Sequence, residues 1–191
     1  MKEALLTVGP RASGKTTFCK KAVELDPSII FISRDEISVS LFGKTSFGTY
    51  KGEHLVVLKE MFEKIKKAAE SSSDLTMILD CFNGNTQERK IIIHKLREYG
   101  FEVVKAWQFI TEPKYVKKWF WGKPKIAKSS EMTEKMGKGF VFYSDDAPIK
   151  DYNLFSTLVT TIGSDGFDKI IKIDPLITNV EEVLKLKAGL K

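Results

Sequence analysis

The stretch Gly9-Pro10-Arg11-Ala12-Ser13-Gly14-Lys15-Thr16 fits the pattern G-x-x-x-x-G-K-[ST], which binds phosphate groups. Glycines at the two ends let the backbone curl until its N–H groups point inward, and the helix that follows adds its positive end. An apolar run at 4–8 predicts a buried strand before the loop. A helix over 16–25 follows and ends at Asp26-Pro27. This strand–loop–helix context favours a phosphate-binding loop over a glycine-rich turn with an incidental lysine.

The spacing assigns a task to each part of this loop. Lys15 is expected to reach the β- and γ-phosphates of a nucleotide, and the Thr16 hydroxyl to be one ligand of a bridging Mg²⁺. Thr17 is the neighbour of that ligand. The residues expected to contact the nucleotide are Gly9, Arg11, Ala12, Ser13, Gly14, Lys15, Thr16 and Thr17.

Strands and helices alternate after the loop. Apolar runs at 29–32, 75–80 and 101–110 predict strands, and helices are expected over 35–42, 53–70 and 86–99, the last capped by Thr86. Residues 154–162 fit a helix or a strand equally well, and a capping box from Thr178 to Glu181 opens a final helix. The pattern predicts one α/β domain over 1–191, with ligands bound beyond the carboxyl ends of parallel strands.

Two carboxylates follow predicted strands. Asp35 lies directly after the second strand, where it would accept the proton of an attacking hydroxyl. The alternative is a helix N-cap, although Ser33 fits that position equally well. Asp80 ends the third strand, as does the carboxylate that holds Mg²⁺ in many nucleotide-binding proteins. Its alternative is an ordinary turn residue.

The positive charge of the chain is concentrated in one segment. The net charge is +6, and the run from Lys114 to Lys128 is rich in lysine and holds no acid. We predict a basic helical lid over about 112–139, facing a partner that carries phosphates; a solvated helix face is the alternative. Trp119 and Trp121 in the lid either stack on a base or sugar, or pack internally.

Cys19 and Cys81 form neither a disulfide framework nor a zinc motif. No apolar segment approaches the length of a membrane span, and the start of the chain does not resemble a signal peptide. From these features we expect a cytoplasmic protein that does not associate with membranes. The oligomeric state is not predicted.

Three blocks of the chain resemble the P-loop polynucleotide kinases of phage and of nucleic-acid repair, which phosphorylate 5′-hydroxyl ends. The blocks are Gly9–Thr16, then 32–36 with Arg34-Asp35, and then Leu79-Asp80 with Asn83, Gln87, Glu88 and Arg89. The resemblance implies a P-loop NTPase three-layer sandwich, adenylate-kinase-like, with a central mostly parallel sheet. It also implies that ATP and Mg²⁺ bind at Lys15 and Thr16 and that Asp35 is the general base.

The resemblance further implies an acceptor site made of Arg34, Asp35, Ser38, Asn83 and Arg89. Two features depart from the family. Ser38 stands where relatives often carry an arginine, and the lid contains no arginine, so that a lysine such as Lys118, Lys123 or Lys125 must contact the transferred group. For Arg89, contact with a substrate phosphate and a surface ion pair are both open.

The leading hypothesis is therefore an ATP-dependent phosphotransferase whose acceptor is the 5′-hydroxyl end of RNA or DNA. A kinase of small molecules or nucleosides on the same fold is the nearest alternative. A nucleotide-switch module that hydrolyses ATP slowly is the third.

Overall fold

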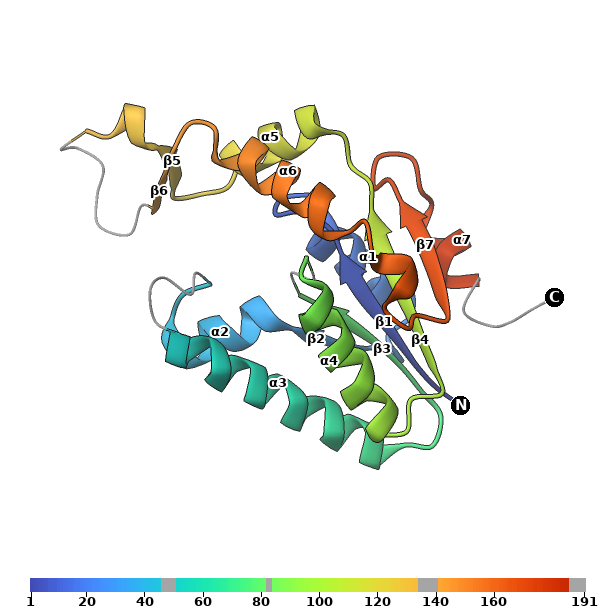
Figure 1. Ribbon diagram of the computed structural model, residues 1–191. Coiled ribbons are helices and arrows are strands. Elements are labelled where there is room, and N and C mark those ends of the chain that lie inside the picture. Colours follow the sequence, from blue (N-terminus) through green and yellow to red (C-terminus); the bar gives the residue numbers. More distant parts are fainter. Residues whose placement is uncertain (46–50, 82–83, 134–140, 186–191) are drawn as a thin grey trace.

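A computed structural model describes the chain except for residues 46–50, 82–83, 134–140 and 186–191 (Figure 1). Its centre is a sheet of five strands in the order β2-β3-β1-β4-β7, and every neighbouring pair is parallel. The strands are β1 (Lys2–Val8), β2 (Ile30–Ser33), β3 (Leu75–Asp80), β4 (Val103–Phe109) and β7 (Lys169–Ile173). The predicted α/β fold is confirmed.

Helices cover both faces of this sheet because β1 is apolar on both sides. Ala4 and Leu6 pack into one core with α3 (Lys51–Ser71) and α4 (Thr86–Glu98). Leu5 points the other way, into a core with α1 (Lys15–Leu25) and α7 (Val180–Lys185). The helix α2 (Arg34–Phe42) contacts α3 on the first side. The predicted three layers are thus present.

The lid differs in part from the predicted one. After α5 (Pro113–Trp121), the short strands β5 (Ile126–Lys128) and β6 (Val141–Tyr143) pair in parallel, and α6 (Ala147–Leu158) returns along α5. Figure 1 shows β5 and β6 at the end of the α5–α6 pair that lies away from the main sheet. Within the segment predicted as a helical lid, a 3₁₀ turn spans Ser129–Glu131, and residues 134–140 lie outside the described residues. Strand and helix beyond residue 139 therefore extend the lid.

Candidate active site

The phosphate-binding loop is held in a tight backbone curve. Ala12 and Gly14 have positive φ values of 61° and 87°. A β-carbon at Gly9 would lie 2.8 Å from both Phe109 Cβ and Ser13 Oγ, so that only glycine fits there. The Ser13 carbonyl accepts a hydrogen bond of 2.8 Å from Thr111 Oγ1, just after β4. The loop is thus built by contacts with β4 as well as by its own sequence.

Lys15 lies inside this curve. Its Nζ donates to the carbonyl oxygens of Gly9 and Pro10 at 3.0 and 2.7 Å. Burial of the ammonium group lowers its pKa to about 8, with Asp80 acting in the opposite direction and Lys123 adding to the decrease. The protein thus holds a poorly compensated cation here, and phosphate oxygens would stabilise its charged form.

Asp80 joins the loop to the sheet. Its Oδ2 accepts a 2.6 Å hydrogen bond from Thr16 Oγ1, and its Oδ1 accepts one of 3.2 Å from Thr7 Oγ1. A hydroxyl and a carboxylate are the oxygen ligands that Mg²⁺ takes, so Thr16 and Asp80 fit the metal role predicted for them. Among the described residues, no group of three His, Cys, Asp or Glu side chains forms a separate metal site.

Asp35 lies at the same edge of the sheet. Ser33, the last residue of β2, is in register with Asp80, the last residue of β3, and Asp35 follows in the first turn of α2. The N-cap of α2 is Ser33, whose hydroxyl accepts from the Glu36 N–H. Because Ser33 makes the cap, the Asp35 carboxylate is not engaged in capping and remains open to solvent. The cap interpretation of Asp35 is wrong.

Electrostatic effects connect Asp35 with the lid. Desolvation raises the pKa of the Asp35 carboxyl, and the Asp80 charge raises it further, whereas Arg34, Lys123 and Lys15 oppose this increase. Desolvation and the neighbouring Arg11 lower the pKa of Lys123, while Asp35 and Asp80 raise it. The lid lysine predicted from the sequence is therefore within electrostatic range of both carboxylates.

The predicted acceptor residues are engaged within the protein. Arg34 is buried and its Nη1 pairs with Glu88 Oε1 at 2.7 Å. Ser38 is also buried, and its hydroxyl donates to the Lys44 carbonyl at 2.6 Å. Asn83 lies outside the described residues. Of the described members of this set, Asp35 is the residue that is open to solvent.

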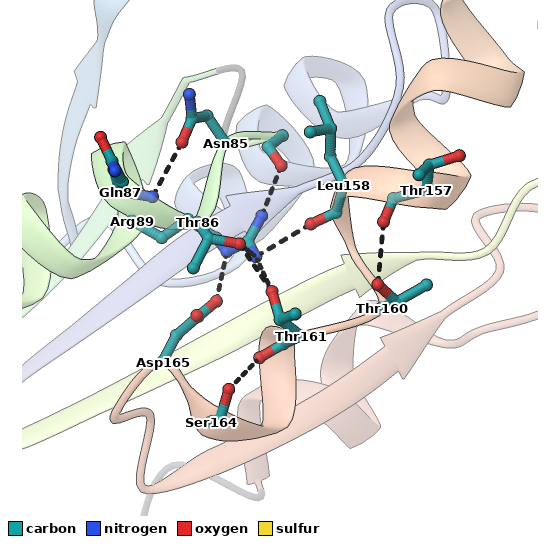
Figure 2. Close-up of polar contacts among 11 residues, drawn as sticks. Asn85, Thr86, Gln87, Arg89, Thr157, Leu158, Thr160, Thr161, Ser164 and Asp165 are labelled. Atoms are coloured by element: carbon teal, nitrogen blue, oxygen red, sulfur yellow. Dashed lines mark hydrogen bonds and ion pairs between the residues drawn. The ribbon is translucent and has the colours of Figure 1, made fainter.

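Arg89 occupies a different place from the predicted one (Figure 2). Its side chain is fully buried, and Nε pairs at 2.5 Å with Asp165, which is equally buried. Its remaining nitrogens donate to the Gly84 carbonyl, the Leu158 carbonyl and the hydroxyls of Thr86 and Thr161. With its donors committed to the protein, Arg89 joins α4 to the end of α6, and the substrate role predicted for it is wrong.

Several residues at the site were missed by the sequence analysis. Thr7 is the polar residue in an apolar strand, and this contrast was its signal. Pro175 lies after β7: a β-carbon at Gly14 would be 3.0 Å from Pro175 Cγ and 3.3 Å from Trp119 Cζ3. Trp119 is half-buried beside the loop, and nothing in the local sequence placed Pro175 there.

A cavity of about 360 Å³ opens next to these groups. Thr16 and Asp35 line one part of it, and Val39, Ser40 and Thr45 line another. This volume lies within the range of small-molecule sites. The cavity therefore joins the predicted metal ligand and the predicted base in one space beyond the strand ends.

No protein-family model matches the chain, and no curated protein matches it. Solved structures do. A tunicamycin resistance protein of Deinococcus radiodurans has a TM-score of 0.59 and 14% identity, covering 100% of this chain and 98% of that one. A shikimate kinase of Bacteroides thetaiotaomicron has a TM-score of 0.54 and 15% identity, covering 96% and 97%. A sugar kinase of a Janibacter species has a TM-score of 0.51 and 15% identity, covering 98% and 92%.

These likenesses show that the chain shares its α/β fold with a tunicamycin resistance protein, a shikimate kinase and a sugar kinase. They extend over nearly the whole chain, lid included. They do not distinguish polynucleotide kinases from other members of this fold. Among the described residues, no helix combines the length and the apolar character needed to cross a bilayer.

Proposed function

We propose that the protein is an ATP-dependent phosphotransferase that moves the γ-phosphoryl group of ATP to a hydroxyl. The observation that carries the proposal is the convergence, at one sheet edge, of Lys15, the Thr16–Asp80 pair and the Asp35 carboxylate. A site of this kind holds a donor and an acceptor side by side, and catalysis comes mainly from positioning and charge neutralisation.

In this proposal, the acceptor oxygen attacks the γ-phosphorus, and the bond from that phosphorus to the β,γ-bridging oxygen breaks. Asp35 takes the proton of the acceptor hydroxyl, for which a raised pKa is suited. Lys15 and Lys123 neutralise phosphate charge. Thr16 and Asp80 would hold Mg²⁺, which supplies further neutralisation of the β- and γ-oxygens when bound.

For the acceptor, the volume of the cavity and the pairing of two arginines within the protein favour a small hydroxylated molecule. Arg34 and Arg89, the cations predicted to bind the phosphates of a nucleic acid, pair inside the protein with Glu88 and Asp165. The cavity beside Asp35 has the volume of a small-molecule site. Two proteins of similar fold are named as a shikimate kinase and a sugar kinase, and both names refer to small hydroxylated molecules.

The 5′-hydroxyl end of RNA or DNA is the second candidate, and the lid supports it. Lys117, Lys118 and Lys125 are exposed, and no ion pair is recorded for them in the described part of the chain. Cations in this arrangement can follow a phosphate backbone. The nucleotide-switch alternative would show partner-dependent ATP hydrolysis with no acceptor consumed.

The test is transfer of label from γ-labelled ATP with Mg²⁺ to two panels of acceptors. One panel holds 5′-hydroxyl DNA and RNA oligonucleotides, and the other holds sugars, hydroxy acids and nucleosides. We expect labelled product in the small-molecule panel; labelling of oligonucleotides alone, with affinity that falls steeply as salt rises, would establish the second candidate. Absence of transfer to either panel would reject the phosphotransferase proposal.

The Asp35→Asn variant tests the mechanism. Loss of the base should lower turnover by about 10²–10⁴-fold while ATP still binds. Asp74→Asn is a matched control, because Asp74 is exposed and precedes β3 at the opposite end of the sheet. Wild-type turnover in Asp35→Asn would remove Asp35 as the base.

A further inference from the structure

The arginines of the chain are Arg11, Arg34, Arg89 and Arg97, and each is ion-paired with one carboxylate. The pairs of Arg34, Arg89 and Arg97 are short, at 2.7, 2.5 and 2.7 Å. The pair between Arg11 Nε and Asp151 Oδ2 is longer, at 3.4 Å, and the Arg11 side chain is 48% exposed. Arg11 is thus the arginine that the protein holds least tightly.

Arg11 also differs from the others in its position. It lies in the phosphate-binding loop, between Gly9 and Lys15, whereas its partners belong to the lid. Asp151 is on α6, and Tyr143 is the last residue of β6; Tyr143 Oη lies 3.3 Å from Arg11 Nη1, and the guanidinium carbon lies 5.7 Å from the ring centre. The guanidinium therefore bridges the loop and the returning part of the lid.

The transferring phosphate would lie close to this bridge. Arg11 directly follows Pro10, whose carbonyl accepts a 2.7 Å hydrogen bond from Lys15 Nζ, so the backbone of Arg11 is next to the lysine that would bind the phosphates. The Arg11 guanidinium also helps to lower the pKa of Lys123 in the lid. The terminal phosphate of ATP must lie between Lys15 and the base, Asp35. Arg11 is therefore at the rim of the space that this phosphate would occupy.

We propose that Arg11 binds the terminal phosphate of ATP, and that Asp151 and Tyr143 are positioning residues that hold its guanidinium at the lid until the phosphate takes the place of the Asp151 carboxylate. This inference rests on the proposed function and adds a phosphate ligand to it. The lid has no arginine, and the guanidinium that would contact the transferred group then comes from the loop itself.

The exchange is physically reasonable. An exposed ion pair at 3.4 Å contributes little stability, so that leaving Asp151 costs little. A guanidinium can donate two parallel hydrogen bonds to a phosphate, and bonds between ionised groups are the stronger ones. A lysine offers only a point charge, and Lys123 cannot supply this geometry.

Nucleotide affinity of two single variants separates this proposal from a purely structural bridge. Arg11→Ala should lower the affinity for ATP by about 10–100-fold, as expected for loss of hydrogen bonds to a charged group, and should change the affinity for ADP little. Asp151→Asn should strengthen ATP binding by up to about 5-fold, because Arg11 no longer has to leave a partner. Isothermal titration calorimetry with ATP and ADP measures all four affinities.

If Arg11 and Asp151 only connect the loop and the lid, both variants should change the ATP affinity in the same direction. If both variants weaken ATP binding, or if Arg11→Ala weakens the binding of ATP and ADP equally, the proposal is overturned. Arg11→Lys, which keeps the charge without the planar fork, should lie between the wild type and Arg11→Ala. Arg97→Ala is the matched control: its partner Asp168 and the start of β4 are at the other end of the sheet, and both affinities should be unchanged.

These measurements need no acceptor, and the two proposals can therefore fail separately. If no acceptor is phosphorylated but the two variants shift ATP affinity in opposite directions, the proposed function fails and the role of Arg11 in nucleotide binding stands. If transfer occurs and the affinities do not follow this pattern, only the role of Arg11 is rejected.

Discussion

Lys15 and Arg89 are both cations near the carboxyl ends of the strands, yet their surroundings differ: Lys15 is half-buried and Arg89 is fully buried. Arg89 pairs at 2.5 Å with a carboxylate as buried as itself, and backbone carbonyls and hydroxyls take its other donors. Lys15 donates to two carbonyls of its own loop, and burial lowers its pKa to about 8. A satisfied buried cation joins elements of a fold, whereas an under-compensated one marks a site for an anion.

The same substitution at both positions should therefore give opposite results. Lys15→Met should lower turnover on the order of 10²–10³-fold, since a preorganised donor to the phosphate is lost, and should leave the free energy of unfolding almost unchanged. Arg89→Met should lower the free energy of unfolding by about 3–5 kcal/mol, because Asp165 stays buried without its partner. Urea denaturation and the label-transfer assay measure the two effects.

The contrast between Lys15 and Arg89 would be wrong if each variant gave the result expected for the other. An Arg89→Met protein of wild-type stability that had lost turnover would return Arg89 to the acceptor site. A Lys15→Met protein that unfolded readily would make Lys15 a structural residue.

The pH dependence of ATP affinity tests whether Lys15 binds phosphate in its charged form. With a pKa of about 8, Lys15 is charged below that pH and becomes neutral as the pH rises through it. Bound phosphates favour the charged form and raise this pKa, so ATP affinity should fall progressively above pH 8. Lys15→Arg should remove the part of this decrease that comes from Lys15 and leave the part that comes from Lys123, whose pKa is also lowered, because a guanidinium does not titrate in this range. Constant wild-type affinity between pH 7 and 10 would contradict the assignment.

At acidic pH, we expect the pH dependence of turnover to come from Asp35. Its raised pKa means that the carboxyl takes up a proton at a higher pH than an ordinary aspartate, and the protonated form cannot act as a base. Turnover at saturating ATP should therefore decrease as the pH falls through this pKa. Turnover at saturating ATP and far-UV circular dichroism, both measured between pH 4 and 7, separate this effect from unfolding; a loss of rate that only follows a loss of folded protein would argue against it.

The smallest expected effect concerns the backbone of the loop. Ala12 has φ of 61°, a conformation that costs a residue with a side chain about 1–2 kcal/mol. Ala12→Gly removes this cost but adds about 0.4–1 kcal/mol of unfolded-state entropy. We expect a net gain in the free energy of unfolding of roughly 0.5 kcal/mol by chemical denaturation. A net loss would show that the alanine methyl group makes a stabilising contact.

The predictable part of this site is local in sequence. The loop motif and the carboxylates after apolar runs predicted that Lys15, Thr16, Asp35 and Asp80 would lie at one edge of the sheet. They do so because parallel strands bring their carboxyl ends together. Arg89 was not predictable in this way. Its partner Asp165 lies 76 residues further along the chain, in a turn with no regular pattern.

The starts of two helices and the structure of the lid were also only partly predictable from the local sequence. Thr86 and Thr178 were predicted as caps, but Asn85 and Asn179, one residue away, bind the first N–H groups. When two neighbouring residues have equal capping ability, the tertiary structure determines which of them forms the cap, and the local sequence does not. The segment 154–162 fitted a helix and a strand equally well, and residues 154–158 form the end of α6. This helix buries few side chains, among them Phe155, so its apolar pattern is weak.

The contact of Trp119 with the loop at Gly14 has an experimental consequence. Trp107 is enclosed in the core at 0% exposure, whereas Trp119 lies half-buried beside the backbone that would receive phosphate. Its emission reports on the polarity and packing at that point, which a ligand in the loop would alter. The chain thus contains an intrinsic optical probe, with which nucleotide titrations can be followed without a label and checked with Trp119→Phe.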